Sequence, residues 1–322
     1  MIDKIYLAGA YLRRKLYNSK IIKPKRLPVP VISVGNLTTG GTGKTPLVIW
    51  LSKYFISKGL KPVVLSRGYK RKSKGTLIVS DGTKIFTPWY ISGDEPYLIA
   101  KNNIPVVVSE SRYNAGLKAL ESLSPDLFIL DDGFQHFQLH RDLNILVSDM
   151  SNPFWKEKGL PLGRLREPWQ FYKYADVILA TKTKDNEQNI DFLKTLGKPY
   201  FKTYEQVSGI TDFKQTFSLD YLKNKRVVVF SGLGNNKYFF ETVDKLSGFY
   251  NFTVDKFISF PDHYDYKNFK LNEKADIYLT TEKDLVKLTY LKNIFALKYE
   301  IFPDEEFRKF LDLRIDELYT KK

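Results

Sequence analysis

The sequence contains no cysteine among its 322 residues. This absence excludes disulfide bonds, zinc sites built on thiolates and catalysis by a thiol, and it leaves the redox compartment open. No apolar run comes near the ~20 residues that a membrane-spanning helix needs, and the N-terminal segment lacks the unbroken apolar stretch and cleavage site of a signal peptide. What remains is a chain long enough for one large or two smaller domains with a hydrophobic core.

Acidic residues are scarce relative to basic ones: 36 Asp and Glu face 51 Lys and Arg, for a net charge of +15. Such an excess favours an acidic partner, which means nucleic acid, an anionic membrane surface or a phosphorylated substrate. The sequence has no helix-turn-helix pattern, no zinc-finger spacing and no aromatic RNA-binding motif, so we expect no nucleic-acid partner. No obligatory protein partner is evident either.

Several glycines gather in the segment SVGNLTTGGTGKTPLV, residues 33–48. Its G-T-G-K-T run lies between an apolar β-like stretch and an apolar helical one, which is the setting of a phosphate-binding loop (P-loop). In such a loop, backbone N–H groups hold phosphate oxygens, Lys44 reaches the terminal phosphates and the Thr45 hydroxyl binds Mg²⁺. A simple Gly/Thr-rich turn is the alternative, because Thr38 stands where these loops usually begin with glycine. The residues expected to contact a nucleotide are Thr38, Thr39, Gly40, Gly41, Thr42, Gly43, Lys44 and Thr45.

Short apolar runs alternate with helical segments through the first half of the chain. Strands that are apolar throughout are typical of a parallel sheet buried on both faces, and the alternation predicts a doubly wound, mostly parallel α/β fold of the P-loop NTPase type. Its ligands are expected at the carboxyl ends of the strands. We expect strands at 31–35, 62–66, 105–110, 126–132, 143–149 and 175–181, with helices near 44–58, 94–102 and 111–122.

The pattern restarts after a polar stretch at 182–224. Strand-like runs at 226–235, 251–260 and 276–284 predict a second, smaller α/β domain, and a cleft between the two domains is a natural place for an active site. We therefore divide the chain into an N-terminal helix with a basic linker (1–30), a P-loop domain (31–210) and a smaller C-terminal domain that closes over the nucleotide (211–322).

Two carboxylates stand at the end of an apolar strand in DLFILDDGFQHFQLHRD, residues 126–142. Beside a P-loop, Asp131 and Asp132 would hold Mg²⁺ or position water; the alternative is a pair of turn aspartates before a glycine. His136 and His140 have an i, i+4 spacing that suggests zinc, but the segment offers no third nitrogen or sulfur donor.

Other polar segments allow both a structural and a functional interpretation. Asp94 precedes Glu-Pro at a helix start, where it either caps the helix or acts as a base that opens onto the cleft. His263, in FPDHYDY, has by itself the character of a surface-loop histidine. The basic run at 66–75 and the proline-flanked run PLGRLREP at 161–168 are either solvated loops or contacts for phosphate and metal.

The first twenty residues predict an imperfectly amphipathic helix. Such a helix either packs onto the protein's own core or lies on an anionic membrane with its long basic side chains extended toward the headgroups. At helical spacing the apolar face holds Ile2, Ile5, Tyr6, Leu12 and Leu16, and the opposite face holds Lys4, Arg14 and Lys15. Arg13 falls on the apolar stripe and Leu7 falls off it.

Seven segments occur together in one order: VGNLTTGGTGKTP, SRGY, GDEP, DDGFQH, PLGRLREP, FPDHY and TTEKD. They extend from about residue 31 to residue 284, and DDGFQH together with GRLREP is far more specific than a P-loop alone. In this order they closely resemble the tetraacyldisaccharide 4′-kinases, the lipid A 4′-kinases of bacteria with an outer membrane. The loop of that family also looks like the present one at Thr38.

The resemblance implies a kinase that transfers the γ-phosphate of ATP to the 4′-hydroxyl of a lipid A disaccharide 1-phosphate precursor. It implies a peripheral (monotopic) protein at the cytoplasmic face of the inner membrane. Asp94 would act as the base on the sugar hydroxyl, and His263 would pair with it across the domain gap. The expected set around Mg²⁺ is Thr45, Asp131, Asp132 and Glu167. The acidic headgroup of the substrate is expected to meet Arg67, Tyr69, Arg112 and Arg166.

Two other functions fit parts of the sequence. A P-loop kinase of a soluble small molecule would share the loop but would have no use for a membrane-binding helix. A nucleotide switch would hydrolyse ATP or GTP slowly and gate a partner, and Asp94 and His263 would then have no part in turnover.

Overall fold

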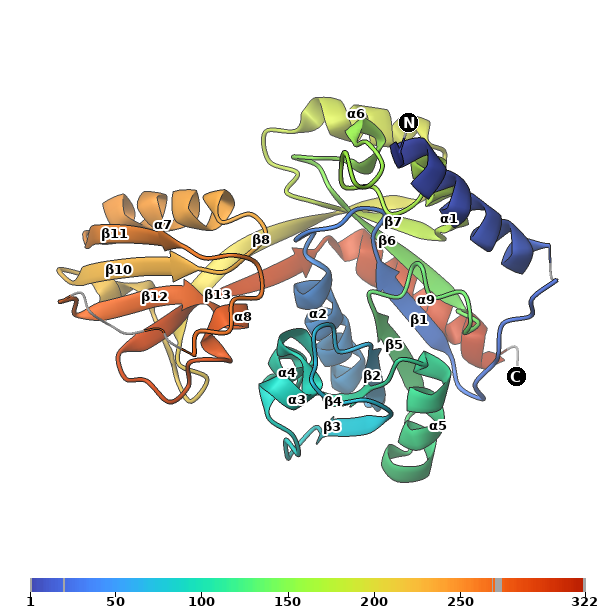
Figure 1. Cartoon of the computed structure of the whole chain (residues 1–322), viewed down its shortest axis with the longest axis horizontal. Helices are drawn as coiled ribbons and strands as arrows, with labels where there is room; N and C mark the ends of the chain where they lie inside the picture. The colour runs from blue at the N-terminus through green and yellow to red at the C-terminus, as the bar shows by residue number, and fades with distance from the viewer. Residues whose placement is uncertain (1, 20, 268, 270–273, 321–322) are drawn as a thin grey trace.

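The strands of the computed structural model join in one long, twisted sheet that runs through the molecule (Figure 1). The structure describes residues 2–19, 21–267, 269 and 274–320. Within these residues the sheet has 13 strands. They are β1 Val31–Gly35, β2 Pro62–Ser66, β3 Leu77–Asp81, β4 Pro105–Val108, β5 Leu127–Asp131, β6 Leu143–Asp149, β7 Val177–Thr181, β8 Tyr200–Thr211, β9 Thr216–Phe217, β10 Arg226–Ser231, β11 Thr253–Ser259, β12 Ile277–Thr281 and β13 Ile294–Pro303.

The strand order is β11-β10-β12-β13-β8-β7-β6-β1-β5-β2-β4-β3, with β9 paired to β8. Neighbouring strands are parallel except for the β3–β4, β8–β13 and β8–β9 pairs. The expected doubly wound, mostly parallel α/β fold is confirmed, but the second α/β unit extends the first sheet instead of forming a separate one.

Helices cover both faces of the sheet, as its buried strands require. They are α1 Ile2–Asn18, α2 Lys44–Ser57, α3 Trp89–Ser92, α4 Asp94–Ala100, α5 Arg112–Leu123, α6 Glu187–Thr195, α7 Lys237–Tyr250, α8 Glu282–Leu285 and α9 Glu305–Thr320, with short 3₁₀ turns at Phe154–Lys156, Trp169–Tyr174 and Leu219–Leu222. We call β1–β7 with the helices packed on them the large lobe, and β9–β12 with α7 and α8 the small lobe.

The antiparallel strands β8 and β13 join the two lobes as a long ribbon (Figure 1). β8 lies in the polar stretch 182–224, where no strand was predicted from the sequence. The polar character of β8 follows from its exposure. Over Tyr204–Ser208 its side chains are half-buried or exposed, because the ribbon leaves the core between the lobes. A strand of that kind lacks the apolar signature of its buried neighbours.

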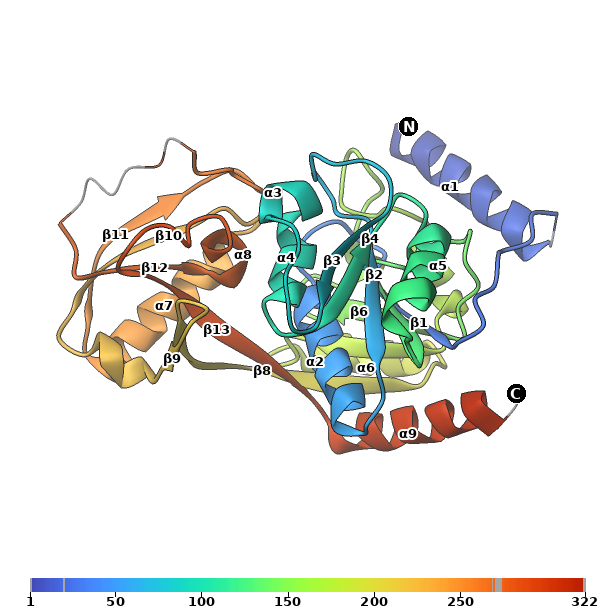
Figure 2. The same ribbon diagram turned by 90° about the horizontal axis from the view of Figure 1, so that it is seen from below.

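The last helix, α9, packs on the large lobe, although the sequence assigns it to the C-terminal domain of 211–322. Phe307, Leu311 and Ile315 share a core with Leu47 and Leu51 of α2 and with the central strands. The chain thus returns from the small lobe along β13 before it ends (Figure 2). A helix and a strand that follow the small lobe in sequence therefore complete the large one.

Helix α1 lies on the face of the large lobe opposite α9 (Figure 2). Its predicted apolar face points outward: Ile2, Ile5 and Leu12 are all about 60% exposed or more. Arg14 lies on the opposite face, as predicted, but that face packs on the large lobe, so its side chain is buried together with the half-buried Leu7. Within the described ranges, no helix combines the length and the apolar character needed to cross a membrane.

Candidate active site

The loop between β1 and α2 has the geometry of a phosphate-binding loop. Gly40 and Gly43 have φ angles of 103° and 85°, which glycine adopts without strain. Asn36 crosses the loop: its Nδ2 donates to Thr42 Oγ1 over 3.0 Å, and its Oδ1 accepts from Lys44 Nζ over 3.1 Å. The Lys44 ammonium is thereby held at the loop, at the N-terminus of a helix whose first N–H groups are available for phosphate.

The GRLREP segment runs alongside this loop. Thr39 N donates to Arg164 O over 2.8 Å, and Arg166 N donates to Leu37 O over 2.8 Å. The Arg166 guanidinium forms a bidentate pair with Asp132, with Nη1–Oδ1 at 2.9 Å and Nη2–Oδ2 at 2.8 Å. The structure thus brings an arginine expected at the substrate against an aspartate expected at the metal.

Asp131 ends β5 as a buried carboxylate with few compensating partners. Its Oδ2 accepts a hydrogen bond from Ser66 Oγ over 3.1 Å. Burial, together with the nearby carboxylates of Glu95 and Asp132, raises the pKa of Asp131 to about 7. This side of the site therefore gathers carboxyl groups, and Lys44 only partly offsets their effect on the pKa of Asp131.

Asp132 lies in a more cationic environment. Loss of hydration opposes ionisation, but the charges of Lys44, Arg166 and Arg112 outweigh it and hold the pKa of Asp132 below its usual value. Glu167 is buried, and this burial raises its pKa despite the neighbouring positive charges. The pKa values of Asp132 and Glu167 are thus shifted in opposite directions.

The carboxylates fit a divalent cation that is shared with phosphate. Mg²⁺ commonly takes one or two protein carboxylates and completes its octahedron with water and phosphate oxygens. In the part of the chain that the structure describes, no group of three His, Cys, Asp or Glu side chains forms a closed metal site. Asp131 beside Glu95, with Thr45 on the same cavity, offers the open arrangement that Mg²⁺ with a nucleotide requires.

Asp94 and His263 meet across the two lobes. Asp94 begins α4 in the large lobe, His263 follows β11 in the small lobe, and Asp94 Oδ2 lies 2.8 Å from His263 Nδ1. The residue that precedes α4 is Gly93, with φ at 97°, so Asp94 is not the helix cap that its sequence context allowed. Its carboxylate is available to the pair, with only Oδ1 engaged in a local contact to Glu95 N at 3.0 Å.

Two lysines of the small lobe lie against this pair. Lys283 Nζ lies 3.2 Å from His263 Nε2, and because an ammonium only donates, Nε2 accepts and Nδ1–H donates to Asp94. Lys287 Nζ lies 3.4 Å from Asp94 Oδ2, and its side chain is 1% exposed. Burial raises the pKa of Asp94, but the His263 hydrogen bond and both lysine charges hold it well below its usual value.

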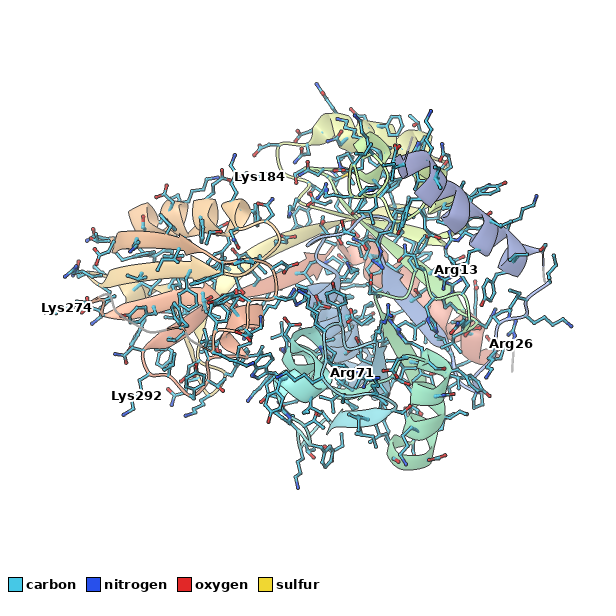
Figure 3. All side chains as sticks on the ribbon, in the orientation of Figure 1. Arg13, Arg26, Arg71, Lys184, Lys274 and Lys292 are labelled. Carbon is cyan, nitrogen blue, oxygen red and sulfur yellow. The ribbon has the colours of Figure 1, made fainter. Side chains whose placement is uncertain are left out.

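A cavity of about 1590 Å³ between the lobes brings these groups together. Two expected site residues are buried behind the cavity lining. Asp94 contacts the lining residue His263, and Thr38 lies within the loop, where its Oγ1 accepts a hydrogen bond from Asn36 Nδ2. Arg13 of α1, which is labelled in Figure 3, also lines the cavity, and its guanidinium lies over the Phe137 ring. The expected site residues that line the cavity are Thr39, Gly40, Gly41, Thr42, Gly43, Lys44, Thr45, Arg67, Tyr69, Arg112, Asp131, Asp132, Arg166, Glu167 and His263.

Comparison with known proteins settles the family. The model of a family described as tetraacyldisaccharide-1-P 4′-kinase matches residues 1–316. The chain belongs to the tetraacyldisaccharide-1-P 4′-kinase family. A relative from Aquifex aeolicus named tetraacyldisaccharide 4′-kinase is 46% identical over 298 residues, 91% of this chain and 90% of the relative. One from Syntrophus aciditrophicus with the same name is 35% identical over 334 residues, covering 94% and 88%.

A solved structure gives the same result for the fold. LpxK from Aquifex aeolicus, crystallised in complex with ATP, superimposes with a TM-score of 0.85 at 42% identity, over 98% of this chain and 97% of that one. The family resemblance, the P-loop α/β fold and the kinase class predicted from the sequence are confirmed. The roles of individual site residues stay predictions.

Several residues of the kinase site were missed from the sequence. Glu95, Lys283 and Lys287 all lie at the Asp94–His263 pair or at Asp131, yet no role was assigned to them. The first two belong to GDEP and TTEKD, which were already among the family segments, so the signal was present. Lys287 has no such signal, because only the turn after α8 brings it to Asp94.

The two histidines of DDGFQHFQLH take separate environments in this kinase. His140 Nε2 lies 3.3 Å from Asp142 Oδ1 at the surface. His136 lines the cavity, and burial together with nearby arginines lowers its pKa to about 3, so it is neutral. The segment is not helical, so an i, i+4 spacing does not place the two rings on one face.

Proposed function

We propose that the chain transfers the γ-phosphate of ATP to the 4′-hydroxyl of a tetraacyldisaccharide 1-phosphate, in the synthesis of lipid A. The observation that carries this proposal is the Asp94–His263 pair, 2.8 Å apart, at the cavity that also contains the phosphate-binding loop. Phosphoryl transfer needs positioned reactants, compensation of negative charge and a place for the proton of the attacking hydroxyl. Residues of suitable chemistry for all three lie at one cavity.

The triphosphate would lie along the loop from Thr38 to Thr45, with Lys44 at its terminal phosphates. The solved relative that was crystallised with ATP supports ATP as the nucleotide. Thr45 and Asp131 would hold Mg²⁺, which would supply positive charge against the negative charge of the transferred group. Asp132 would serve that site through its pair with Arg166, and Glu167 as the acidic neighbour behind Gln135.

The proton of the 4′-hydroxyl would pass to Asp94. The carboxylate is ionised at neutral pH, because His263 and the two lysines lower its pKa. His263 Nδ1–H holds the carboxylate in one orientation, in the manner of a histidine that steers an acidic partner. Because the transition state is loose, the proton leaves late and a weak base in the right place is sufficient.

The acceptor's phosphate would meet the arginines at the α1 side of the cavity. Arg112 is 5% exposed, and within the described residues its Nε has no hydrogen-bond partner. Burial lowers its pKa only to about 10, so it stays cationic. Arg67, Tyr69 and Arg166 line the same cavity, and such a cluster suits a sugar phosphate.

The acyl chains would stay in an anionic membrane on which the protein lies as a peripheral enzyme, at the cytoplasmic face of the inner membrane. The outward apolar face of α1 supports this location, as does Leu162 of the PLGRLREP segment, which is 63% exposed. Gly159, two residues before that segment, approaches Leu7 of α1 closely, so the two elements form one surface. The basic excess of the chain favours attraction to that surface.

Transfer of radiolabel from γ-labelled ATP to a tetraacyldisaccharide 1-phosphate in detergent micelles tests the proposal. We expect labelled lipid with the wild type and, with Asp94→Ala, a rate lower by about 100-fold or more, as for the loss of a general base. Labelled soluble sugars or nucleosides without labelled lipid would instead establish the soluble-substrate kinase. Slow hydrolysis that Asp94→Ala leaves unchanged would establish the nucleotide switch.

A further inference from the structure

Helix α1 carries a buried arginine on the side that faces the large lobe. Arg14 is 2% exposed and is one of the largest buried side chains. Its guanidinium carbon lies 4.8, 4.5, 4.9 and 4.6 Å from the ring centroids of Phe134, Phe137, Phe171 and Tyr174. A charged group enclosed by aromatic rings is costly to bury unless it also finds an opposite charge and hydrogen-bond acceptors.

The partners that Arg14 finds belong to the two most characteristic segments of the site. Nη2 donates to Phe134 O over 3.1 Å, in the segment that follows Asp131 and Asp132. Nε lies 3.6 Å from Glu167 Oε1, at the end of GRLREP. Both side chains of this ion pair are 3% exposed or less, so the interaction is not screened by water.

A short series of contacts continues from this ion pair to the phosphate-binding loop. Glu167 Oε2 accepts from Gln135 Nε2 over 3.2 Å, and the same Nε2 donates to Asn36 O over 2.8 Å. Asn36 Oδ1 accepts from Lys44 Nζ over 3.1 Å. Glu167, Gln135 and Asn36 therefore connect a side chain of α1 with the lysine of the phosphate-binding loop.

We propose that Arg14 is a positioning residue of the phosphoryl-transfer centre. When α1 is packed on the large lobe, Arg14 orients Glu167 and Gln135, and through Asn36 it also orients Lys44. The proposal rests on the proposed function, because it assigns Lys44 and Glu167 to phosphoryl transfer. Helix α1 then has two faces with separate tasks: an outward face, on which Leu12 is 59% exposed, and an inward face that carries Arg14. Attachment to a surface needs only the first, whereas catalysis depends on the second.

A rival explanation is that Arg14 only anchors the helix, and kinetics separate the two. The variants are Arg14→Met, Arg14→Lys, Glu167→Gln and the double variant Arg14→Met/Glu167→Gln, all in the full chain. Lys15→Met is the matched control, because it removes the same charge from the next, exposed position of α1. The measurements are kcat and KM for phosphate transfer from ATP to the tetraacyldisaccharide 1-phosphate, with cosedimentation on phosphatidylethanolamine–phosphatidylglycerol vesicles.

We expect Arg14→Met to lower kcat by about 10- to 100-fold, the usual effect of losing a group that orients catalytic residues, with vesicle binding equal to that of Lys15→Met. Arg14→Lys keeps the charge without the planar fork, so it should remain folded and recover only part of kcat. Since Arg14 acts through Glu167, the double variant should be no slower than Glu167→Gln alone.

Two results would overturn the inference. In one, both Arg14 variants resemble Lys15→Met, with kcat unchanged and only the lipid KM or vesicle binding altered. In the other, the losses of Arg14→Met and Glu167→Gln multiply in the double variant. A wild type and a Lys15→Met variant that both fail to phosphorylate the lipid would contradict the proposed function instead, which keeps the two failures distinct.

Discussion

Asp94 and Asp131 are both buried carboxylates of the large lobe, yet their surroundings move their pKa values in opposite directions. Asp94 faces His263, Lys283 and Lys287, which stabilise its ionised form. Asp131 faces other carboxylates, and its pKa rises to about 7. Carboxyl groups whose environments separate their pKa values commonly have different tasks. We assign the first to the proton of the acceptor and the second to the cation.

The raised pKa of Asp131 has a consequence for stability that can be measured without substrate. In the unfolded chain this carboxyl ionises near pH 3.8, and in the folded protein near pH 7. The folded state therefore binds the proton more tightly, so the contribution of Asp131 to stability is fully present below pH 3.8 and is lost as the pH rises to 7. The loss is about 1.4 kcal/mol for each pH unit in this window.

Asp131→Asn removes this dependence while keeping an acceptor for the Ser66 hydroxyl. We expect the variant to gain stability relative to the wild type between pH 5 and pH 8, when unfolding by urea is followed without Mg²⁺ or nucleotide. Saturating Mg²⁺ with ATP should shrink the difference, because a cation compensates the carboxylate. A stability difference that is the same at both pH values would contradict the assigned environment.

At the scale of elements, the buried strands were predictable and the ribbon was not. The runs that give β2 and β6 are apolar throughout, since helices cover both of their faces, and the structure reproduces the expected bounds 62–66 and 143–149. β8 has polar side chains because it bridges two lobes, so its sequence carries no comparable signal. For α1, the helix was predictable, but the burial of Arg14 depends on aromatic residues more than 100 positions away.

The outward face of α1 leads to a prediction about membrane binding. Leu12 is 59% exposed, and transferring one leucine side chain from water to an apolar phase is worth about 1.5–3 kcal/mol. We expect Leu12→Ser to weaken partition onto anionic vesicles by about tenfold or more, as measured by cosedimentation. Leu313→Ser is the control, because Leu313 is 66% exposed on α9, on the opposite face of the large lobe. Equal weakening in both variants would remove α1 as the membrane-facing element.

At the scale of the whole molecule, the site exists because one chain crosses between two lobes twice. β8 leads out of the large lobe and β13 leads back, and α9 then packs beside α2. This arrangement places His263 and Lys283 against the start of α4. From the sequence, the local context of Asp94 allowed a base, whereas a role for His263 and its pairing with Asp94 came only from resemblance to a family. Local patterns could not supply the pairing, because it depends on how two lobes pack across 169 positions of sequence.

The most direct test of the account is a double-mutant cycle on Asp94 and His263, with kcat for phosphorylation of the lipid acceptor as the readout. Asp94→Asn and His263→Ala should each lower kcat by about 100-fold or more, and the double variant should be no slower than the slower single one, because the two side chains act as a unit. A His263→Ala variant within a few-fold of the wild type, or losses that multiply in the double variant, would contradict a centre assembled across the two lobes.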